Sequence, residues 1–203
     1  MDLSEIFRQY GTDKDINGYS QLYHILFDHL KDKPLKLLEI GIGTMIVGAP
    51  SSMVGYSQPG YKPGGSLRAW RDYFKNGEIY GFDVQPDTQF TEDRIQTRLC
   101  DSTQSGDVKR VIEELGDIKF DIIIDDGNHY DQAQLMTLMN FYSYLKDGGI
   151  YIIEDIYPGS TLSVNPKIIG QLCNNDPYIL VGVKNNMCVI YKKHLNCERV
   201  NNF

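Results

Sequence analysis

Short apolar runs that alternate with helical patterns constrain this chain more than any other feature of its sequence. The runs are rich in Ile, Leu, Val and Tyr, and most of them stop at a glycine or an acidic residue. Strands that alternate with helices along a chain typically form a parallel sheet covered by helices. The predicted strands are residues 35–41, 78–84, 95–101, 120–126, 149–155, 178–183 and 187–192, and the predicted helices are residues 22–30, 66–74, 107–115 and 131–145.

The end of the pattern predicts a hairpin. The segment "KNN" at 184–186 separates the last two apolar runs by a turn, so the final strand should be antiparallel to its neighbour. We therefore predict an α/β fold with a Rossmann-like, doubly wound sheet, mostly parallel with one antiparallel C-terminal strand. The 203 residues fit one domain, 1–203. Ligands of such sheets bind at the carboxyl ends of the strands.

The first strand ends in the glycine turn "LEIGIGT". Gly41 and Gly43 would let the backbone approach a ligand closely, although a plain tight turn is the alternative. A dinucleotide-binding fingerprint would have a third glycine at position 46, which is Ile46. Glu39 would repel a pyrophosphate, but it would suit a cofactor with a cationic amino-acid portion.

The next two strand ends carry one acid each. Asp83 in "GFDV" can accept hydrogen bonds from both hydroxyls of a ribose, which is the role of this position in nucleotide-binding sheets. Asp101 in "LCDS" can accept one from an adenine amino group, or it can cap the following helix. An adenosine without phosphates, joined to a cationic amino acid, is S-adenosylmethionine, which we predict as the cofactor.

The fourth and fifth strands end in pairs of acids. Asp125 and Asp126 end one strand, and Glu154 and Asp155 end the other. Consecutive crossovers place these ends side by side, where four carboxylates would repel one another unless a cation lay among them. Oxygen ligands at this density favour Mg²⁺. Helix capping by these acids is the alternative.

His129 follows Asp126 by three residues in "DDGNH". Imidazole accepts a proton near neutral pH, and it is a softer ligand than Mg²⁺ prefers. We therefore predict that His129 is the general base, which takes the proton of an acceptor hydroxyl held beside the ion. A surface histidine at the start of a helix is the alternative.

Taken in order, "LEIGIGT", "GGSLRAWRDYF", "GFDV", "DDGNH" and "IIEDIY" resemble the Mg²⁺-dependent sugar O-methyltransferases of antibiotic biosynthesis. Examples are the macrocin and mycinamicin O-methyltransferases and the tetracenomycin rhamnose methyltransferases. The resemblance covers residues 10–158 and implies a class I methyltransferase fold. It implies that Asp126, Glu154 and Asp155 bind the metal and that His129 is the base. The expected cofactor-binding residues are Glu39, Gly41, Gly43, Ser66, Asp83, Asp101, Asp125 and Tyr19.

Two further segments are expected to border the site. "YGTDKDINGYSQLY" resembles the family segment near the active site, so residues 1–33 are predicted to form an N-terminal cap. Its candidate residues are Tyr10, Thr12, Asp13, Lys14 and Tyr19. Residues 45–65 are rich in Gly, Pro and Ser and long for a connection, which predicts a lid over the acceptor. Tyr56 and Tyr61 are its candidate stacking residues.

The chain departs from the family pattern in places. Asn128 stands where the family commonly has serine, and Glu154 where it commonly has aspartate. The longer arm of Glu154 could shift the metal or leave only one acid of the pair bound. The macrolide enzymes also carry a large N-terminal region that we expect this chain to lack, which leaves the acceptor open.

Composition narrows the class of protein. The net charge is -7 and no basic cluster stands out, which argues against a nucleic-acid partner. No apolar run approaches the roughly 20 residues that span a bilayer, and the acidic N-terminus does not read as a signal peptide. We expect a cytoplasmic homo-oligomer with a small-molecule acceptor. The cysteines lack zinc-site spacing and are predicted to be unpaired: Cys100, Cys173, Cys188 and Cys197.

These patterns predict methyl transfer from S-adenosylmethionine to a hydroxyl of a small natural product, with a sugar as the expected acceptor. One alternative is a catechol-type O-methyltransferase, which would use a lysine as base. Another is a nicotinamide oxidoreductase or other nucleotide-binding protein, which Ile46 and Glu39 disfavour. A cofactor-binding scaffold would need neither the acid pairs nor His129.

Overall fold

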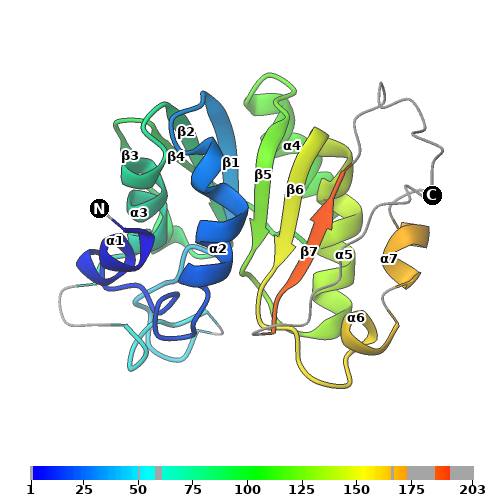
Figure 1. Ribbon diagram of the computed structural model, residues 1–203. Coiled ribbons are helices and arrows are strands. Elements are labelled where there is room, and N and C mark those ends of the chain that lie inside the picture. Colours follow the sequence, from blue (N-terminus) through cyan, green and yellow to red (C-terminus); the bar gives the residue numbers. More distant parts are fainter. Residues whose placement is uncertain (1, 50, 58–60, 166, 173–185, 193–203) are drawn as a thin grey trace.

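The computed structural model describes residues 2–49, 51–57, 61–165, 167–172 and 186–192. Within these residues, seven strands form one sheet in the order β3-β4-β2-β1-β5-β6-β7 (Figure 1). The strands are β1 (Leu35–Ile40), β2 (Gly77–Asp83), β3 (Thr91–Glu92), β4 (Ile95–Leu99), β5 (Phe120–Asp125), β6 (Leu145–Ile153) and β7 (Cys188–Tyr191). The five central strands are parallel, and β7 is antiparallel to β6. The predicted fold class is confirmed.

The edge of the sheet differs from the prediction. A short strand, β3, pairs antiparallel with β4 and was not predicted. Its length is 2 residues, too short for an alternating pattern to show in the sequence. The predicted strand 178–183 and positions 184 and 185 of the predicted turn lie outside the described residues.

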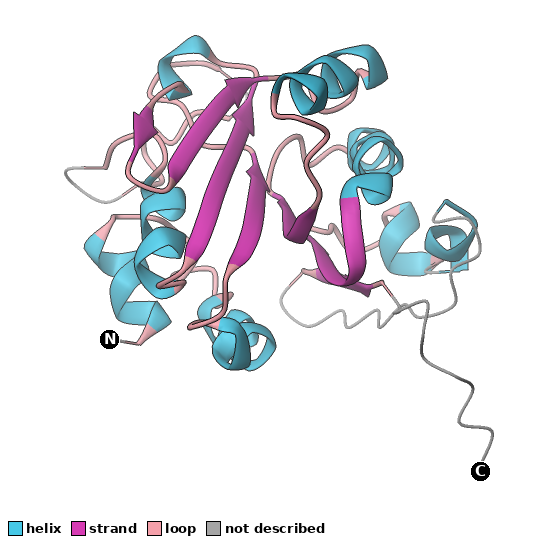
Figure 2. Cartoon of the chain, turned by 90° about the horizontal axis from the view of Figure 1, so that it is seen from above, coloured by secondary structure: helices cyan, strands magenta, loops and turns pink. Residues whose placement is uncertain are grey.

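Helices cover both faces of the sheet (Figures 1 and 2). One face carries α1 (Leu3–Gln9), α2 (Ser20–Phe27), η1 (Asp28–Leu30) and α3 (Gly65–Tyr73), and the other α4 (Ser105–Glu114), α5 (Asp131–Phe141), η3 (Tyr142–Tyr144), α6 (Thr161–Val164) and α7 (Lys167–Leu172). η2 (Pro86–Thr88) follows β2. The four predicted helices are found, whereas α1, α6 and α7 were not predicted. No helix in the described ranges is both long and apolar enough to cross a bilayer.

The N-terminal helices are fixed by the single tryptophan of the chain, Trp70. Its fully buried ring packs edge-on against Phe7 of α1 and Tyr23 of α2, with ring centroids 5.0 Å apart in both pairs. Aromatic contacts of this kind add to the free energy gained by burying the rings. The loop between α1 and α2 is thereby held beside the carboxyl ends of β1, β5 and β6.

Two of the cysteines are described, Cys100 and Cys188, and both are buried free thiols. Burial raises the pKa of each thiol to about 12. Both therefore stay protonated and unreactive at neutral pH. The prediction of unpaired cysteines is confirmed for this pair, and Cys173 and Cys197 lie outside the described residues.

The ends of β1 and β5 meet at Gly41. Its φ of +88° is in the left-handed region, and the N–H of Asp126 donates to the Ile40 carbonyl at 2.8 Å. A Cβ atom on Gly41 would lie 2.1 Å from the carbonyl oxygen of Asp126. Position 41 thus needs glycine both for its backbone conformation and for the close approach of the two chain segments.

We predict that Gly41→Ala lowers the free energy of unfolding by at least about 2 kcal/mol, since it adds backbone strain and a clash with backbone atoms. Gly106→Ala in α4 is the matched control. A Cβ atom there meets nothing within 4 Å, so this change should stabilise the helix by about 0.5–1 kcal/mol. Urea unfolding followed by Trp70 fluorescence measures both. Equal stabilities for the two variants would contradict the close approach at Gly41.

Candidate active site at the carboxyl ends of the strands

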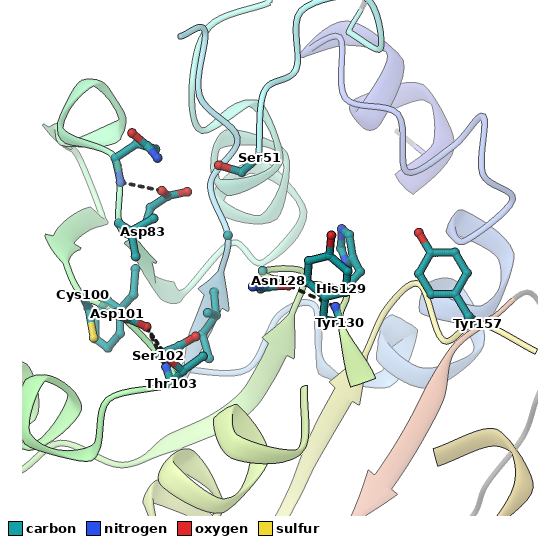
Figure 3. A pocket seen from close by; sticks show the side chains of 16 residues that line it. Ser51, Asp83, Cys100, Asp101, Ser102, Thr103, Asn128, His129, Tyr130 and Tyr157 are labelled. Carbon is teal, nitrogen blue, oxygen red and sulfur yellow. Dashed lines mark hydrogen bonds between the residues drawn. The ribbon is translucent and has the colours of Figure 1, made fainter. Parts of the chain in front are cut away.

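Two adjoining cavities lie at this edge of the sheet. The larger cavity, about 520 Å³, is lined by residues that follow β1, β2, β4 and β5, and Figure 3 shows it. The second, about 430 Å³, is called the acidic cavity because Asp13, Glu39, Asp126 and Asp155 line it. The residues common to both walls are Gly41, Ser51, Gly127, His129 and Tyr157. A ligand that occupied both cavities would therefore pass His129.

The acids predicted to bind the nucleoside line the larger cavity. The carboxylate of Asp83 accepts from the N–H groups of Ile42 (2.7 Å) and Gln85 (2.8 Å), so it also fixes the glycine turn. Burial raises the pKa of Asp83. Asp101 Oδ1 accepts from the N–H (3.0 Å) and hydroxyl (2.7 Å) of Thr103. In Figure 3 both acids lie together on one side, apart from His129.

Lys14 is the centre of the acidic cluster. Its Nζ lies 2.8 Å from Asp126 Oδ2, 2.8 and 2.9 Å from the two oxygens of Glu154, and 3.5 Å from Glu39 Oε1. Burial alone would lower the pKa of Lys14, but the surrounding carboxylates raise it well above its usual range. Lys14 is therefore expected to be protonated at neutral pH, and it supplies part of the positive charge that the strand-end acids require.

Glu154 is buried against the N-terminal helices. Both of its oxygens are held by Lys14, and one also accepts from the hydroxyl of Tyr23. Burial, and then the nearby Asp126, raise the pKa of Glu154 well above its usual range. Glu154 lines neither of the two cavities. The structure thus places this predicted metal ligand behind the cavity wall, in contact with Lys14.

Asp126, His129 and Asp155 come together at the wall of the acidic cavity. One potential ligand atom from each lies within 4.8 Å of the others, and all three side chains are partly exposed. His129 Nε2 is 3.4 Å from Asp155 Oδ2. Asp155 has a φ of +53°, a conformation that non-glycine residues rarely adopt and that is often found at functional sites. The carboxylate pair fits a hard cation such as Mg²⁺.

His129 presents one of its nitrogens to this cluster. Its Nδ1 is buried without a hydrogen-bond partner among the described residues, whereas Nε2 faces Asp155. A neutral imidazole with Nε2 unprotonated could take a proton from a hydroxyl group in the cavity. The structure thus brings the predicted base and two predicted metal ligands to the junction of the two cavities.

The remaining predicted cofactor residues divide into two groups. Glu39, Gly43 and Ser66 line the acidic cavity, and Glu39 Oε2 accepts from the indole N–H of Trp70 at 2.5 Å. Burial raises the pKa of Glu39. Asp125 and Tyr19 line neither cavity.

Asp125 lies directly behind the chain turn at Gly127. Its Oδ1 accepts from the Gly127 N–H at 3.3 Å, and Oδ2 has no partner among the described residues. Burial raises the pKa of Asp125 to about 8. Its carboxyl group therefore supports the turn that carries Asn128 and His129.

The tyrosines of the predicted lid differ from each other. Tyr56 is 72% exposed at the rim of the acidic cavity, where it could stack on an acceptor. The Tyr61 hydroxyl instead donates to the carbonyl of Ile42 at 3.0 Å. Tyr61 is therefore an anchor of the glycine turn. A Cβ atom on Gly43 would lie 2.7 Å from its hydroxyl oxygen.

Sequence reasoning missed Tyr23 as a donor to Glu154, and it did not predict that Lys14 pairs with the strand-end acids. The spacing of Tyr19 and Tyr23 could have indicated the role of Tyr23, because residues four positions apart lie on the same face of a helix. Sequence reasoning also assigned no role to several residues that line the larger cavity: Ser51, Gln85, Ser102, Thr103, Tyr130 and Tyr157.

Known proteins are similar to this chain in sequence and in fold, although no family model matches the chain. The chain is 35% identical over 158 residues to the 8-demethyl-8-(2-methoxy-alpha-L-rhamnosyl)-tetracenomycin-C 3'-O-methyltransferase of Streptomyces olivaceus, a match that covers 77% of this chain and 37% of that protein. It is 32% identical over 158 residues to the mycinamicin VI 2''-O-methyltransferase of Micromonospora griseorubida, over 77% of this chain and 36% of that protein. The chain is a relative of the macrocin and mycinamicin O-methyltransferases.

A solved structure extends the likeness to the fold. The MycE methyltransferase from the mycinamycin biosynthetic pathway, in complex with Mg, SAH and mycinamycin VI, has a TM-score of 0.76 and 26% identity. That match covers 99% of this chain and 57% of the MycE chain. In sequence, the matched 158 residues of this relative of the macrocin and mycinamicin O-methyltransferases cover little more than a third of the length of the curated proteins.

For the ion cluster of this O-methyltransferase relative, we predict that Lys14→Met lowers the free energy of unfolding by about 3–5 kcal/mol, because it leaves buried carboxylates unpaired. The double variant Lys14→Met with Glu154→Gln should lose less of the free energy of unfolding than the single variant Lys14→Met. Lys36→Met is the matched control. Lys36 pairs with Glu78 at the surface, so its replacement should lower the free energy of unfolding by at most about 1 kcal/mol. Urea unfolding measures all three. A Lys14→Met cost equal to that of Lys36→Met would contradict the buried cluster.

Proposed function

We propose that this chain transfers a methyl group from S-adenosylmethionine to a sugar hydroxyl of a small natural product, with Mg²⁺ as cofactor. The observation that carries the proposal is the position of His129 beside Asp126 and Asp155, in the wall that the larger cavity and the acidic cavity share. The named activities of the relatives support the reaction class, because they are O-methyltransferases of a rhamnosyl-tetracenomycin, of demethylmacrocin and of mycinamicin VI.

The two cavities suggest how the cofactor would lie. The adenosine would occupy the larger cavity, with Asp83 toward the ribose and Asp101 toward the adenine. The amino-acid portion would extend past Gly41 toward Glu39 and Ser66 in the acidic cavity. The methyl group would then lie near the junction, within reach of an acceptor that enters beside His129.

The reaction is a direct displacement. The acceptor oxygen forms a bond to the methyl carbon, the carbon–sulfur bond breaks, and S-adenosylhomocysteine leaves with the electron pair on sulfur. His129 Nε2 takes the hydroxyl proton. Mg²⁺ held by Asp126 and Asp155 would orient the hydroxyl and lower its pKa. Catalysis then rests on alignment and on deprotonation of the nucleophile.

The alternative functions fit the site less well. A catechol-type enzyme needs a lysine that can give up its proton, and Lys14 is held as a cation by three carboxylates. A nicotinamide oxidoreductase would place a pyrophosphate beside the glycine turn, where Glu39 is buried. A cytoplasmic location and a homo-oligomeric state remain predictions from the sequence.

We expect methyl transfer to stop when divalent ions are removed with EDTA and to return when Mg²⁺ is added. S-adenosylhomocysteine should bind and change Trp70 fluorescence, because the indole N–H donates to Glu39 in the acidic cavity. NAD is the control ligand and should not bind. The acceptors to test are rhamnosylated and other glycosylated small molecules, with their aglycones as negative controls. Full activity after exhaustive chelation would remove the metal from the proposal, and binding of NAD alone would overturn it.

Replacing the proposed base should slow the chemical step. His129→Ala and His129→Gln should each lower kcat by about 10²–10⁴-fold, the usual contribution of a general base. Affinity for S-adenosylhomocysteine should change little, because the base serves the acceptor. His29→Ala, at an exposed position on η1, is the control. A near-wild-type rate in either His129 variant would exclude His129 as the base.

A further inference from the structure

The most exposed tyrosines of the described residues gather at the two cavities. Tyr130 is 80% exposed, Tyr56 is 72% exposed and Tyr157 is 61% exposed. Tyr130 lines the larger cavity, Tyr56 lines the acidic cavity, and Tyr157 lines both. Exposing large aromatic rings to water is unfavourable, and rings that gather at a cavity commonly mark the place where a ligand covers them.

The hydroxyl groups of these three tyrosines make no hydrogen bond in the part of the chain that the structure describes. Other tyrosines near the site are tied down by theirs. The Tyr10 hydroxyl donates to Asp72 Oδ2 at 2.5 Å, and the Tyr61 hydroxyl donates to the carbonyl of Ile42 at 3.0 Å. The exposed rings therefore have no structural contact of this kind that explains their position at the cavities.

The backbone that carries Tyr157 is fixed on both sides of the residue. Ile156 is buried in the core, and its N–H donates to the carbonyl of Asn186 at 2.7 Å. The N–H of Ser160 donates to the carbonyl of Tyr157 at 3.1 Å. A ring presented by a fixed backbone loses little conformational entropy when a ligand binds, so this arrangement suits a binding residue.

Tyr157 lies on the acceptor side of His129. In Figure 3, Asp83 and Asp101 are on one side of His129 and Tyr157 is on the other. Tyr157 follows Asp155 by two positions, and it belongs to the wall that both cavities share. A molecule that presents a hydroxyl group to His129 therefore brings the part next to that hydroxyl close to the ring of Tyr157.

We propose that Tyr157 is the stacking residue for the acceptor and that the favoured acceptor is a sugar that carries an aromatic or other flat apolar group. This inference rests on the proposed function and deepens it, because it assigns a specificity-determining residue to the acceptor. The flat group covers the exposed ring of Tyr157, and stacked rings gain free energy beyond that of buried area alone.

Two glycosides that differ only in the group attached to the sugar test the proposal. They are para-nitrophenyl α-L-rhamnopyranoside and methyl α-L-rhamnopyranoside, and the sugar is chosen because a relative acts on a rhamnosyl compound. Binding of each glycoside to the full chain, saturated with S-adenosylhomocysteine and Mg²⁺, is measured by ligand-observed nuclear magnetic resonance. The variants are Tyr157→Ala and Tyr157→Phe. Tyr191→Ala is the matched control, because Tyr191 is a 40% exposed tyrosine on β7 that lines neither cavity.

We expect the wild type to bind the nitrophenyl glycoside about 10-fold more tightly than the methyl glycoside. Tyr157→Ala should lose this preference. Tyr157→Phe should keep it, because the ring and not the hydroxyl group makes the contact. Tyr191→Ala should behave as the wild type does. Urea unfolding verifies that all three variants are folded.

An unchanged preference in Tyr157→Ala, or no preference in the wild type, would overturn the stacking role. A change of oligomeric state in Tyr157→Ala, measured by sedimentation velocity, would instead assign the ring to a contact between copies of this chain and would also overturn it. Failure of the proposed function gives a different result: the preference for the nitrophenyl glycoside is present and depends on Tyr157, but no methyl group is transferred from S-adenosylmethionine to any glycoside.

Discussion

The rest of the site depends on the ion pairs that the buried ammonium group of Lys14 forms with the acids at the strand ends. It joins Glu39 at the end of β1, Asp126 after β5 and Glu154 after β6, and it comes from the loop between α1 and α2. Carboxylates gathered this closely in a protein interior repel one another and lose hydration. One cation that contacts all three lowers both costs, so the strand ends can approach each other.

Aromatic residues of the core connect this cluster of charges to the N-terminal helices. Trp70 donates to Glu39 and packs on Phe7 and Tyr23, and Tyr23 in turn donates to Glu154. The same residues therefore bury apolar surface on one side and satisfy buried carboxylates on the other. Such a network holds the N-terminal helices in one position relative to the sheet, and the position of the candidate metal ligands follows from it.

Backbone conformation separates the two cavities. Gly41 brings β1 against the Asp126 carbonyl, and the positive φ of Asp155 directs its side chain away from that of Glu154. The chain near Gly41, Gly127 and His129 is the shared wall. The larger cavity is therefore bordered by the two acids that suit a nucleoside, and the acidic cavity holds the charges that suit a cation and an acceptor hydroxyl.

The sequence by itself determined the sheet and the location of the site. The alternation of apolar runs with helical patterns predicted the parallel strands, and parallel strands must place their carboxyl ends at one edge. For the same reason Asp83, Asp101, Asp126 and His129 could be predicted to gather there. The strand β3 could not be predicted, because 2 residues carry no periodic signal.

Only the tertiary structure decided which acids meet which cations. Lys14 contacts Asp126 across 112 positions of the chain and Glu154 across 140, and no local pattern encodes such pairs. Glu154 and Asp155 are adjacent and chemically alike, yet one faces the protein interior and the other the cavity. Tyr61, a candidate stacking residue in the sequence, instead anchors the glycine turn. In each case the sequence showed which chemical group was present, but the partner of that group depended on how distant segments of the chain pack.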